Sequence, residues 1–377
     1  MTLILVVIGA ALVYILQNRI YQKYWKKSLE VSVAFEKKQA VKGETVNLIE
    51  VVTNNKLLPL LMLHLKFTVD RKLKFTDMED SVSVSDKCYK NDIFSLLFYQ
   101  KITRTLPFVC LGRGFFTITE ADVVSSNLFL NVQYVEHMPL YTEITVFPEL
   151  ADGERLEIPF RKMMGELLTK RYLYEDPFEF RGIREYSTSD TMSSINWKAT
   201  ARTGELKVNV HDYTASQEIC ILLNLESETN WESDVLMEEC ISIAAGICEK
   251  FFAADVGVKI CSNGCDLYSK QPVYLEAGSS SLHMDAILSG LARIDLKLPM
   301  QKFTKVLEEL VSKETENTLY IMVSVASGMN LQDAYENLAQ KSSKAMWILP
   351  YSHRPEFEIK NCPSVDVVPW EVTANER

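Results

Sequence analysis

The run Ile219-Cys220-Ile221-Leu222-Leu223-Asn224-Leu225 decides the fold class of the C-terminal half of the chain. It is almost entirely apolar, as in a strand that is covered on both faces of its sheet. A long amphipathic segment follows, in which apolar residues recur at helical spacing from Val235 to Phe251. A buried strand followed by an amphipathic helix is the unit from which α/β domains are built.

The same alternation continues towards the C-terminus. We expect further strands at 256–261 and 318–325 and a last strand at 345–350, with helices at 279–294, 303–312 and 331–341. This order predicts a doubly wound, mostly parallel sheet, whose ligands would bind in the loops after Leu225 and Val325. Neither loop contains a glycine-rich phosphate-binding motif, so no motif supports nucleotide binding.

The chain before this region follows a period of two instead. Residues 29–35 and 61–69 alternate apolar and polar side chains, which is typical of half-buried strands. Further strand-like runs occupy 45–53, 81–85, 101–110, 115–119 and 144–147. No strong amphipathic helix interrupts them, so residues 28–148 are predicted to form an antiparallel β-sandwich.

The N-terminus is the most apolar part of the chain. Leu3–Leu16 contains no charged side chain, and with the residues up to Tyr21 it is long enough to cross a hydrocarbon layer of ~30 Å. Basic residues follow the apolar run, at Arg19 and between Lys23 and Lys27, which is the reverse of a cleaved signal peptide. We therefore expect an uncleaved anchor, with a cleaved signal and a buried core helix as alternatives. The positive-inside rule predicts a single-pass protein of the cell membrane whose main body is cytoplasmic.

Composition excludes several classes of protein. The 377 residues carry 40 Lys+Arg and 50 Asp+Glu, a formal charge of −10, which lacks the basic footprint of a nucleic-acid binder. The eight cysteines are spread along the chain and mostly lie in apolar runs, as free thiols do in a reducing compartment. The closest pair, Cys261 and Cys265, has poor spacing for zinc.

A segment between the two regions carries a recognisable pattern. It reads Arg181-Gly182-Ile183-Arg184-Glu185-Tyr186-Ser187-Thr188-Ser189-Asp190 and continues as Ile195-Asn196-Trp197-Lys198-Ala199-Thr200-Ala201-Arg202-Thr203-Gly204-Glu205-Leu206. This segment resembles the signature of the domain of unknown function 58 family, roughly R-E-Y-x-x-G-D-x-x-R-x-I-x-W-K-x-[ST]-A-R-x-x-x-L. Three further stretches resemble elements of the same family: Arg113-Gly114-Phe115, Asn127-Leu128-Phe129 and Val146-Phe147-Pro148-Glu149-Leu150.

The resemblance implies more than the residues do. It implies a membrane-anchored β-sandwich followed by an α/β domain similar to the von Willebrand factor A domain. It also implies association with a MoxR-type AAA+ ATPase, for which such proteins act as adaptors in envelope or complex assembly. Two positions depart from the family pattern, with Ser189 in place of Gly and Ser193 in place of Arg. The second departure removes a fork-shaped hydrogen-bond donor.

The signature suggests two roles for its charged and aromatic side chains. One is an ion-pair network that fixes the turn between the domains, and the other is a surface for a protein partner, because Arg and Trp are typical interface anchors. We expect one short helix here, with Asp190 as its N-cap and Gly204 just beyond its C-terminus. The candidate partner-binding residues are Arg184, Glu185, Tyr186, Asp190, Trp197, Lys198 and Arg202.

The resemblance to the von Willebrand factor A domain raises the question of a metal site. Such a site uses D-x-S-x-S after the first strand, where this chain has Asn224, Glu226 and Glu228. It also uses an Asp after a later strand, and the corresponding strand of this chain is not followed by an Asp. Mg²⁺ requires compact oxygen ligands, and the neutral Asn224 attracts the cation less strongly than the Asp that normally holds the first position of the motif. We therefore expect no functional metal and no cofactor.

Taken together, these observations predict a multidomain α+β protein that is not an enzyme. We expect a membrane-anchored scaffold or adaptor whose cytoplasmic body binds a protein partner, a MoxR-type AAA+ ATPase. The alternatives are an outward-facing, metal-dependent adhesion protein and a cysteine hydrolase. The predicted parts are an anchor at 1–21, the β-sandwich at 28–148, the signature segment at 149–215, the von Willebrand factor A-like domain at 216–352 and a tail at 353–377.

Overall fold

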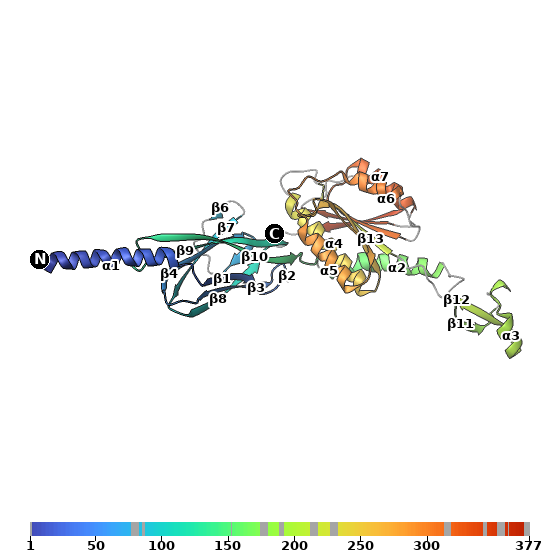
Figure 1. Cartoon of the computed structure of the whole chain (residues 1–377). Coiled ribbons are helices and arrows are strands. Elements are labelled where there is room, and N and C mark those ends of the chain that lie inside the picture. The colour runs from blue at the N-terminus through green and yellow to red at the C-terminus, as the bar shows by residue number, and fades with distance from the viewer. Residues whose placement is uncertain are drawn as a thin grey trace. The chain divides into compact units, whose positions relative to one another are not determined.

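The structure is a computed structural model of the whole chain, and its elements are shown in Figure 1. It forms two compact units, Met1–Glu149 and Leu150–Arg377, each described by itself below. The residues described are 2–76, 83–84, 87–151, 153–173, 180–187, 192–211, 218–226, 233–312, 318–341, 345–352, 359–360 and 362–372.

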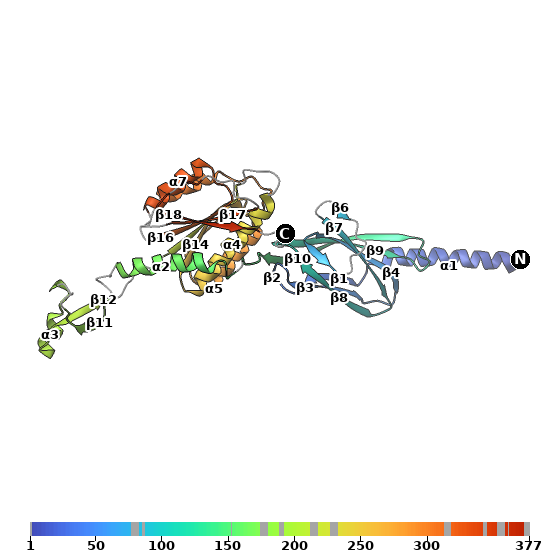
Figure 2. The same cartoon turned by 180° about the vertical axis from the view of Figure 1, so that it is seen from behind.

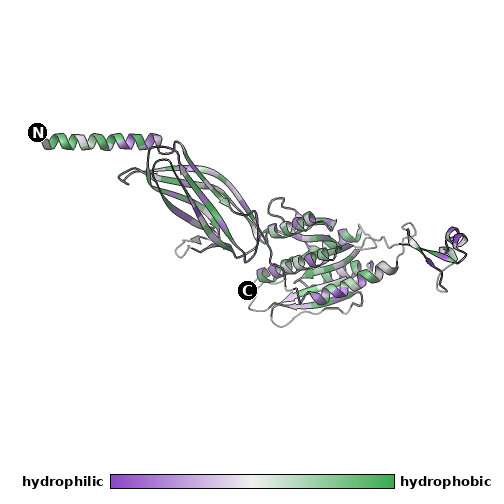
Figure 3. Cartoon of the chain, turned by 90° about the horizontal axis from the view of Figure 1, so that it is seen from below, coloured by the Kyte–Doolittle hydropathy of each residue, from purple (hydrophilic) through white to green (hydrophobic). Residues whose placement is uncertain are grey.

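The first unit begins with a long apolar helix, α1 (Thr2–Tyr24). Its segment Leu3–Tyr24 has a mean hydropathy of 2.0 and is long and apolar enough to cross a membrane. The apolar side chains of its first four turns are exposed, and Figure 3 shows the hydrophobic colour along the helix. Near its end the environment changes, because Tyr21 and the following Trp25 are buried against the strands of the unit.

Two sheets make up the rest of the first unit. The four-stranded sheet has the order β1-β3-β8-β5 and is antiparallel. The six-stranded sheet has the order β2-β10-β9-β4-β7-β6, in which β2 and β10 are the parallel pair. The strands are β1 (Leu29–Phe35), β2 (Gln39–Val41), β3 (Thr45–Asn54), β4 (Leu60–Asp70), β5 (Leu73–Phe75), β6 (Ser83–Val84), β7 (Lys87–Leu96), β8 (Gln100–Cys110), β9 (Gly114–Ser126) and β10 (Gln133–Phe147).

Inward side chains of both sheets share one hydrophobic core. Leu48 on β3 and Leu65 on β4 are both fully buried in it, as alternation along the two strands requires. The strands expected from this alternation are confirmed for β1, β3, β4 and β8. Strand β7 was not expected, because two of its inward positions hold the charged residues Lys90 and Asp92, which interrupt the apolar alternation.

The second unit contains a six-stranded sheet of order β15-β14-β13-β16-β17-β18. Five strands are parallel, and β15 is antiparallel to β14 at one edge. The strands are β13 (Glu218–Asn224), β14 (Gly257–Cys265), β15 (Pro272–Gly278), β16 (Thr318–Ser324), β17 (Ala345–Tyr351) and β18 (Val365–Glu371). The expectation of a mostly parallel sheet is therefore correct for this unit.

Helices cover both faces of this sheet, as Figure 2 shows. Ile219, Ile221 and Leu223 of β13 pack in the core beneath α4, whereas Cys220 and Leu222 pack in the opposite core with α6 and α7. Burial on both faces explains the unbroken apolar run of this strand. The helices are α2 (Glu157–Leu173), α4 (Ser233–Ala253), α5 (Ser281–Arg293), α6 (Phe303–Ser312) and α7 (Met329–Lys341).

Three elements of the large sheet and its covering helices were not expected from the sequence. Helix α2 lies within the segment predicted as a signature turn, and its Phe160 ring packs 5.0 Å from that of Phe251 on α4. Strand β15 forms the antiparallel edge. The expectation that 345–350 is the last strand is wrong, because β18 pairs in parallel with β17 and buries Trp370.

Candidate functional site

The signature segment forms a small hairpin that carries a helix between its strands. β11 (Phe180–Glu185) pairs antiparallel with β12 (Lys207–His211), and a short 3₁₀ turn, η1 (Met192–Ser194), precedes the helix α3 (Trp197–Thr203). The backbone N–H of Tyr186 donates to the carbonyl of Leu206 at 3.0 Å, which extends the pairing towards the helix. The hairpin therefore brings together the two ends of the segment that contains α3.

Both ends of α3 are capped. The side-chain oxygen of Asn196 accepts a hydrogen bond of 2.9 Å from the backbone N–H of Ala199. At the other end, Gly204 has a φ of 77° and donates its N–H to the carbonyl of Thr200, as expected for this glycine. The expectation that Asp190 caps the helix is wrong, since Asn196 does so, and Asp190 itself lies outside the described residues.

The side chains of α3 are presented to solvent. Trp197 is 63% exposed, and Lys198 and Arg202 are exposed with neither an ion pair nor a hydrogen bond in the described part of the chain. Glu185 pairs with Lys207 at 3.2 Å, a residue that the signature did not single out. Arg184 donates from Nη1 to the backbone carbonyl of Glu185 at 3.0 Å.

A second candidate site lies at the carboxyl ends of the central strands of the large sheet. Asn224, at the end of β13, is fully buried, and its Nδ2 donates to Oγ of Ser324 on β16 at 2.9 Å. Its Oδ1 accepts from the backbone N–H of Glu226 and from Nδ2 of Asn263, each at 3.0 Å. The side chain thus has its hydrogen bonds supplied by protein groups.

Within the described part of the chain, the acidic residue next to Asn224 does not complete a metal site. Glu226 accepts a hydrogen bond of 3.1 Å from the backbone N–H of Phe303, at the first turn of α6. Glu228 lies outside the described residues. Asn263 donates to Asn224, and its Oδ1 accepts from the backbone N–H of Leu225 at 2.9 Å. This neutral, internally bonded donor set does not fit Mg²⁺, which needs free carboxylate and hydroxyl oxygens.

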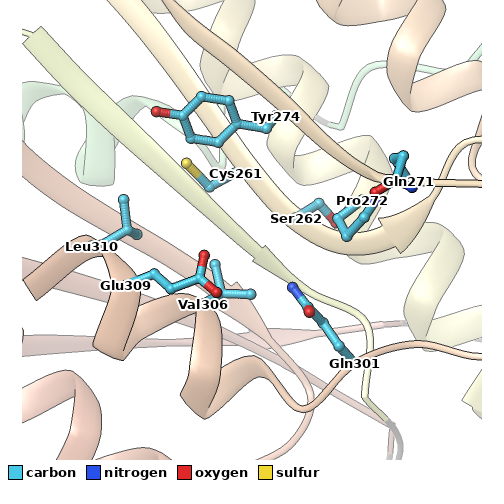
Figure 4. A pocket seen from close by; sticks show the side chains of 9 residues that line it. All are labelled: Cys261, Ser262, Gln271, Pro272, Tyr274, Gln301, Val306, Glu309 and Leu310. Atoms are coloured by element: carbon cyan, nitrogen blue, oxygen red, sulfur yellow. The ribbon is translucent and has the colours of Figure 1, made fainter. Parts of the chain in front are cut away.

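A cavity of about 330 Å³ lies beside this network and was not expected from the sequence. Figure 4 shows it between side chains of β14 and β15 on one side and those of α6 on the other. Its lining residues are Cys261, Ser262, Gln271, Pro272, Tyr274, Gln301, Val306, Glu309 and Leu310. The polar lining side chains are uncharged except for Glu309, so the cavity does not attract anions.

Three buried cysteines of the second unit, Cys220, Cys240 and Cys248, are not activated nucleophiles. The thiols of Cys220 and Cys261 lie 3.8 Å apart on neighbouring strands. The hydrogen bond with Cys261, followed by burial, raises the pKa of Cys220 well above its ordinary value, and burial likewise raises the pKa of Cys240 and of Cys248. A nucleophilic cysteine requires the opposite shift.

The first unit contains a buried carboxyl pair that sequence reasoning missed. Glu50 on β3 is fully buried near the carboxylate of Asp92 on β7, which pairs with Arg104 at 2.9 Å. Burial, followed by the charge of Asp92, raises the pKa of Glu50 to about 8. Neither oxygen of Glu50 has a hydrogen-bond partner among the described residues, so burial penalises the charged form of this carboxyl.

Comparison with known proteins finds one family whose pattern matches part of the chain. Residues 182–349 match the family described as "Protein of unknown function DUF58", a range that begins in β11 and ends in β17. No curated protein matches the chain.

Similarity to solved structures is limited in extent. The CARDB domain of a protein from Pyrococcus furiosus shares 14% identity, with a TM-score of 0.22, over 32% of this chain and 90% of that one. The third cohesin of ScaC from Acetivibrio cellulolyticus shares 13% identity, with a TM-score of 0.23, over 31% and 98%. The sporulation control protein Spo0M from Bacillus subtilis shares 12%, with a TM-score of 0.18, over 42% and 58%.

Proposed function

We propose that this chain is a membrane-anchored, non-enzymatic adaptor whose cytoplasmic body binds a protein partner, a MoxR-type AAA+ ATPase. Helix α1 is long and apolar enough to serve as the anchor, and the basic residues after it favour a cytoplasmic body by the positive-inside rule. The observation that carries the proposal is the surface of α3, on which Trp197 and Arg202 are both exposed and Arg202 has no ion pair within the part of the chain that the structure describes.

An exposed tryptophan on a helix with both ends capped is suited to binding. The caps at Asn196 and Gly204 fix the helix before any partner arrives, so little ordering entropy opposes association. Tryptophan and arginine contribute most to binding energy when a partner covers them. Lys198 adds a second cation, so the surface fits a partner with an apolar pocket and an acidic rim.

The arrangement of the second unit supports the same proposal. The parallel strands β14-β13-β16-β17-β18 between two helical layers agree with the von Willebrand factor A-like fold that the signature implies. The two antiparallel sheets of the first unit agree with a β-sandwich. At the position where an adhesion domain holds its metal, the neutral network around Asn224 favours contacts with protein over binding of a cation.

The test is recovery of the tagged full chain from its native membranes in mild detergent, with and without ATP, followed by mass spectrometry. The wild type should recover an AAA+ ATPase in an ATP-dependent manner, and Trp197→Ala combined with Arg202→Ala should lose it. A matched control combines Leu282→Ala with Lys305→Ala, which removes one exposed apolar and one exposed basic side chain from α5 and α6.

The two double variants separate the outcomes. Loss in the α3 variant with retention in the control supports the proposal. Equal recovery from both variants would restrict the signature to a structural role. Recovery of cell-surface proteins alone would favour the outward-facing adhesion protein.

A further inference from the structure

The end of α1 is fixed against the first unit by specific contacts. The hydroxyl of Tyr21 donates to the carbonyl of Pro59 at 2.8 Å, and the ring of Trp25 stacks on that of Tyr134 with centroids 6.1 Å apart. Nδ2 of Asn127 donates to Oδ1 of Asn18 at 2.6 Å. The helix therefore does not swing freely from the unit, and the membrane boundary falls at a defined level of the fold.

Exposed apolar loops lie around this end of the helix. The tip of the β9–β10 hairpin carries Phe129, which is 60% exposed and lies 5.8 Å from the ring of Tyr14. Figure 1 shows this hairpin beside the C-terminal part of α1. The β7–β8 tip carries Phe98, 55% exposed, and the loop after β3 carries Leu57, 72% exposed. Apolar tips beside a membrane-length helix are suited to the lipid interface.

A cavity of about 410 Å³ opens among these elements. It is lined by Ile20 and Tyr24 of α1, by Lys27 and Ser28 just beyond the helix, and by Lys56, Leu57 and Leu58. One wall is therefore apolar and continuous with the helix, whereas the other carries two amino groups. No acidic side chain lines the cavity.

Lys56 forms no ion pair with any residue that the structure describes. Its Nζ is enclosed and has no hydrogen-bond partner among the residues that the structure describes. Burial lowers the pKa of Lys56 to about 8, because nothing nearby stabilises the ammonium. Enclosing a charged amino group without a partner destabilises the folded protein, and an anion bound in the cavity would remove that destabilisation.

We propose that this cavity binds the phosphate of an anionic phospholipid, with Lys56 and Lys27 on the phosphate and Ile20 and Leu57 along the first part of an acyl chain. The proposal rests on the membrane anchorage proposed above. The location selects a lipid over a free anion, because the cavity joins a cationic wall to the surface of the apolar helix. The leaflet that faces the basic end of an anchor is also the one rich in anionic lipid.

Bound lipid would set the orientation of the unit. A headgroup at Lys56 fixes the level of the loop that carries Leu57, and the backbone N–H of Tyr99 donates to the carbonyl of Lys56 at 3.2 Å. The β7–β8 tip is thereby tied to the same headgroup. The first unit would then stand at a fixed level on the membrane, with the hairpin tips in the interface.

The experiment uses the purified full chain in mild detergent, with native mass spectrometry of bound phosphatidylglycerol and phosphatidylcholine at equal concentration. Lys56→Gln should bind phosphatidylglycerol about fivefold more weakly than the wild type, the contribution of one lysine at an anionic surface. Lys74→Gln is the matched control, because Lys74 is exposed and lies on β5, which pairs with the end of β8 that is remote from the β7–β8 tip. Lys27→Gln gives a second variant should Lys56→Gln fold poorly.

Further measurements distinguish a lipid phosphate from free inorganic phosphate and test whether the chain is anchored in the membrane. Inorganic phosphate should not compete with the lipid, and competition at equal concentration would overturn the lipid assignment. Equal binding of both lipids, or of phosphatidylglycerol by wild type and both cavity variants, would overturn the site while leaving the anchor intact. Failure of the chain to float with vesicles of phosphatidylcholine and phosphatidylglycerol would overturn anchor and site together.

Discussion

The amide of Asn224 donates a hydrogen bond of 2.9 Å to Oγ of Ser324, and this bond joins the carboxyl ends of the two central strands of the large sheet. Oγ of Ser324 donates in turn to the carbonyl of Ala326 at 2.9 Å. Both side chains are fully buried, so the donors and acceptors must be satisfied within the protein. The edge where an α/β sheet commonly binds ligands is here closed by neutral groups.

Asn224→Asp tests whether this network replaces a metal. The substitution removes the donor to Ser324 and buries a carboxylate, so we expect a loss of about 2–4 kcal/mol in unfolding free energy. Urea denaturation with and without Mg²⁺ measures it, and Asn330→Asp, on the exposed first turn of α7, is the control with the same chemistry. Recovery of stability by Mg²⁺ in the Asn224 variant would show that the site is one carboxylate away from binding metal.

Much of the fold was predictable, because burial leaves a period in the sequence. The unbroken apolar run of β13 predicted a strand covered on both faces, and the helical spacing after it predicted α4. Strand β18 escaped prediction because it contains Pro369 and two acidic residues. Helix α2 escaped because its polar and apolar residues do not segregate clearly, although Met163 and Leu167 are buried.

The candidate sites were less predictable, since they depend on contacts between distant residues. The capping role fell to Asn196 and not to Asp190, because the helix begins later than the charge pattern suggested. Glu50 did leave a signal, as the period of two along β3 places it on the inward face. Nothing in the sequence near Lys56 predicted its enclosure, which arises from the end of α1 packing beside it.

Ile243→Asp tests the register of α4. Ile243 is fully buried beneath the sheet, so an unpaired carboxylate there should cost about 4 kcal/mol or more and unfold the second unit. Val235→Asp places the same charge on an exposed position of the same helix and should change stability little. Circular dichroism melting of both variants decides the matter. A parent-like melt of the Ile243 variant would contradict the position of the helix in the core.

Cysteine labelling tests the side of the membrane on which the body lies. Seven of the eight native cysteines are buried, including Cys88 and Cys265, and Cys362 is partly exposed. In a Cys362→Ser background, Lys74→Cys and Glu308→Cys each introduce one exposed thiol, in the first and second unit respectively. An impermeant maleimide should label both only after permeabilisation. Labelling of intact cells would place the body outside and favour the adhesion protein.

Glu50 makes the stability of the first unit depend on pH. Its pKa is raised from 4.5 to about 8, so the folded state holds a proton that the unfolded chain releases. The stabilisation from the protonated carboxyl is complete below about pH 4.5 and is lost as the pH rises through 8. The charged groups of Asp92, Lys90 and Arg104 surround the Glu50 carboxyl.

Glu50→Gln removes this titration and keeps a side chain of nearly the same size. We expect the wild type to lose a few kcal/mol of unfolding free energy between pH 5 and pH 9, and the glutamine variant to lose much less. Glu36→Gln, an exposed position on the loop after β1, should follow the wild type. Urea denaturation monitored at several pH values measures all three proteins. Parallel pH profiles for wild type and Glu50→Gln would show that Glu50 is ionised in the fold, with Lys90 and Arg104 balancing both carboxylates.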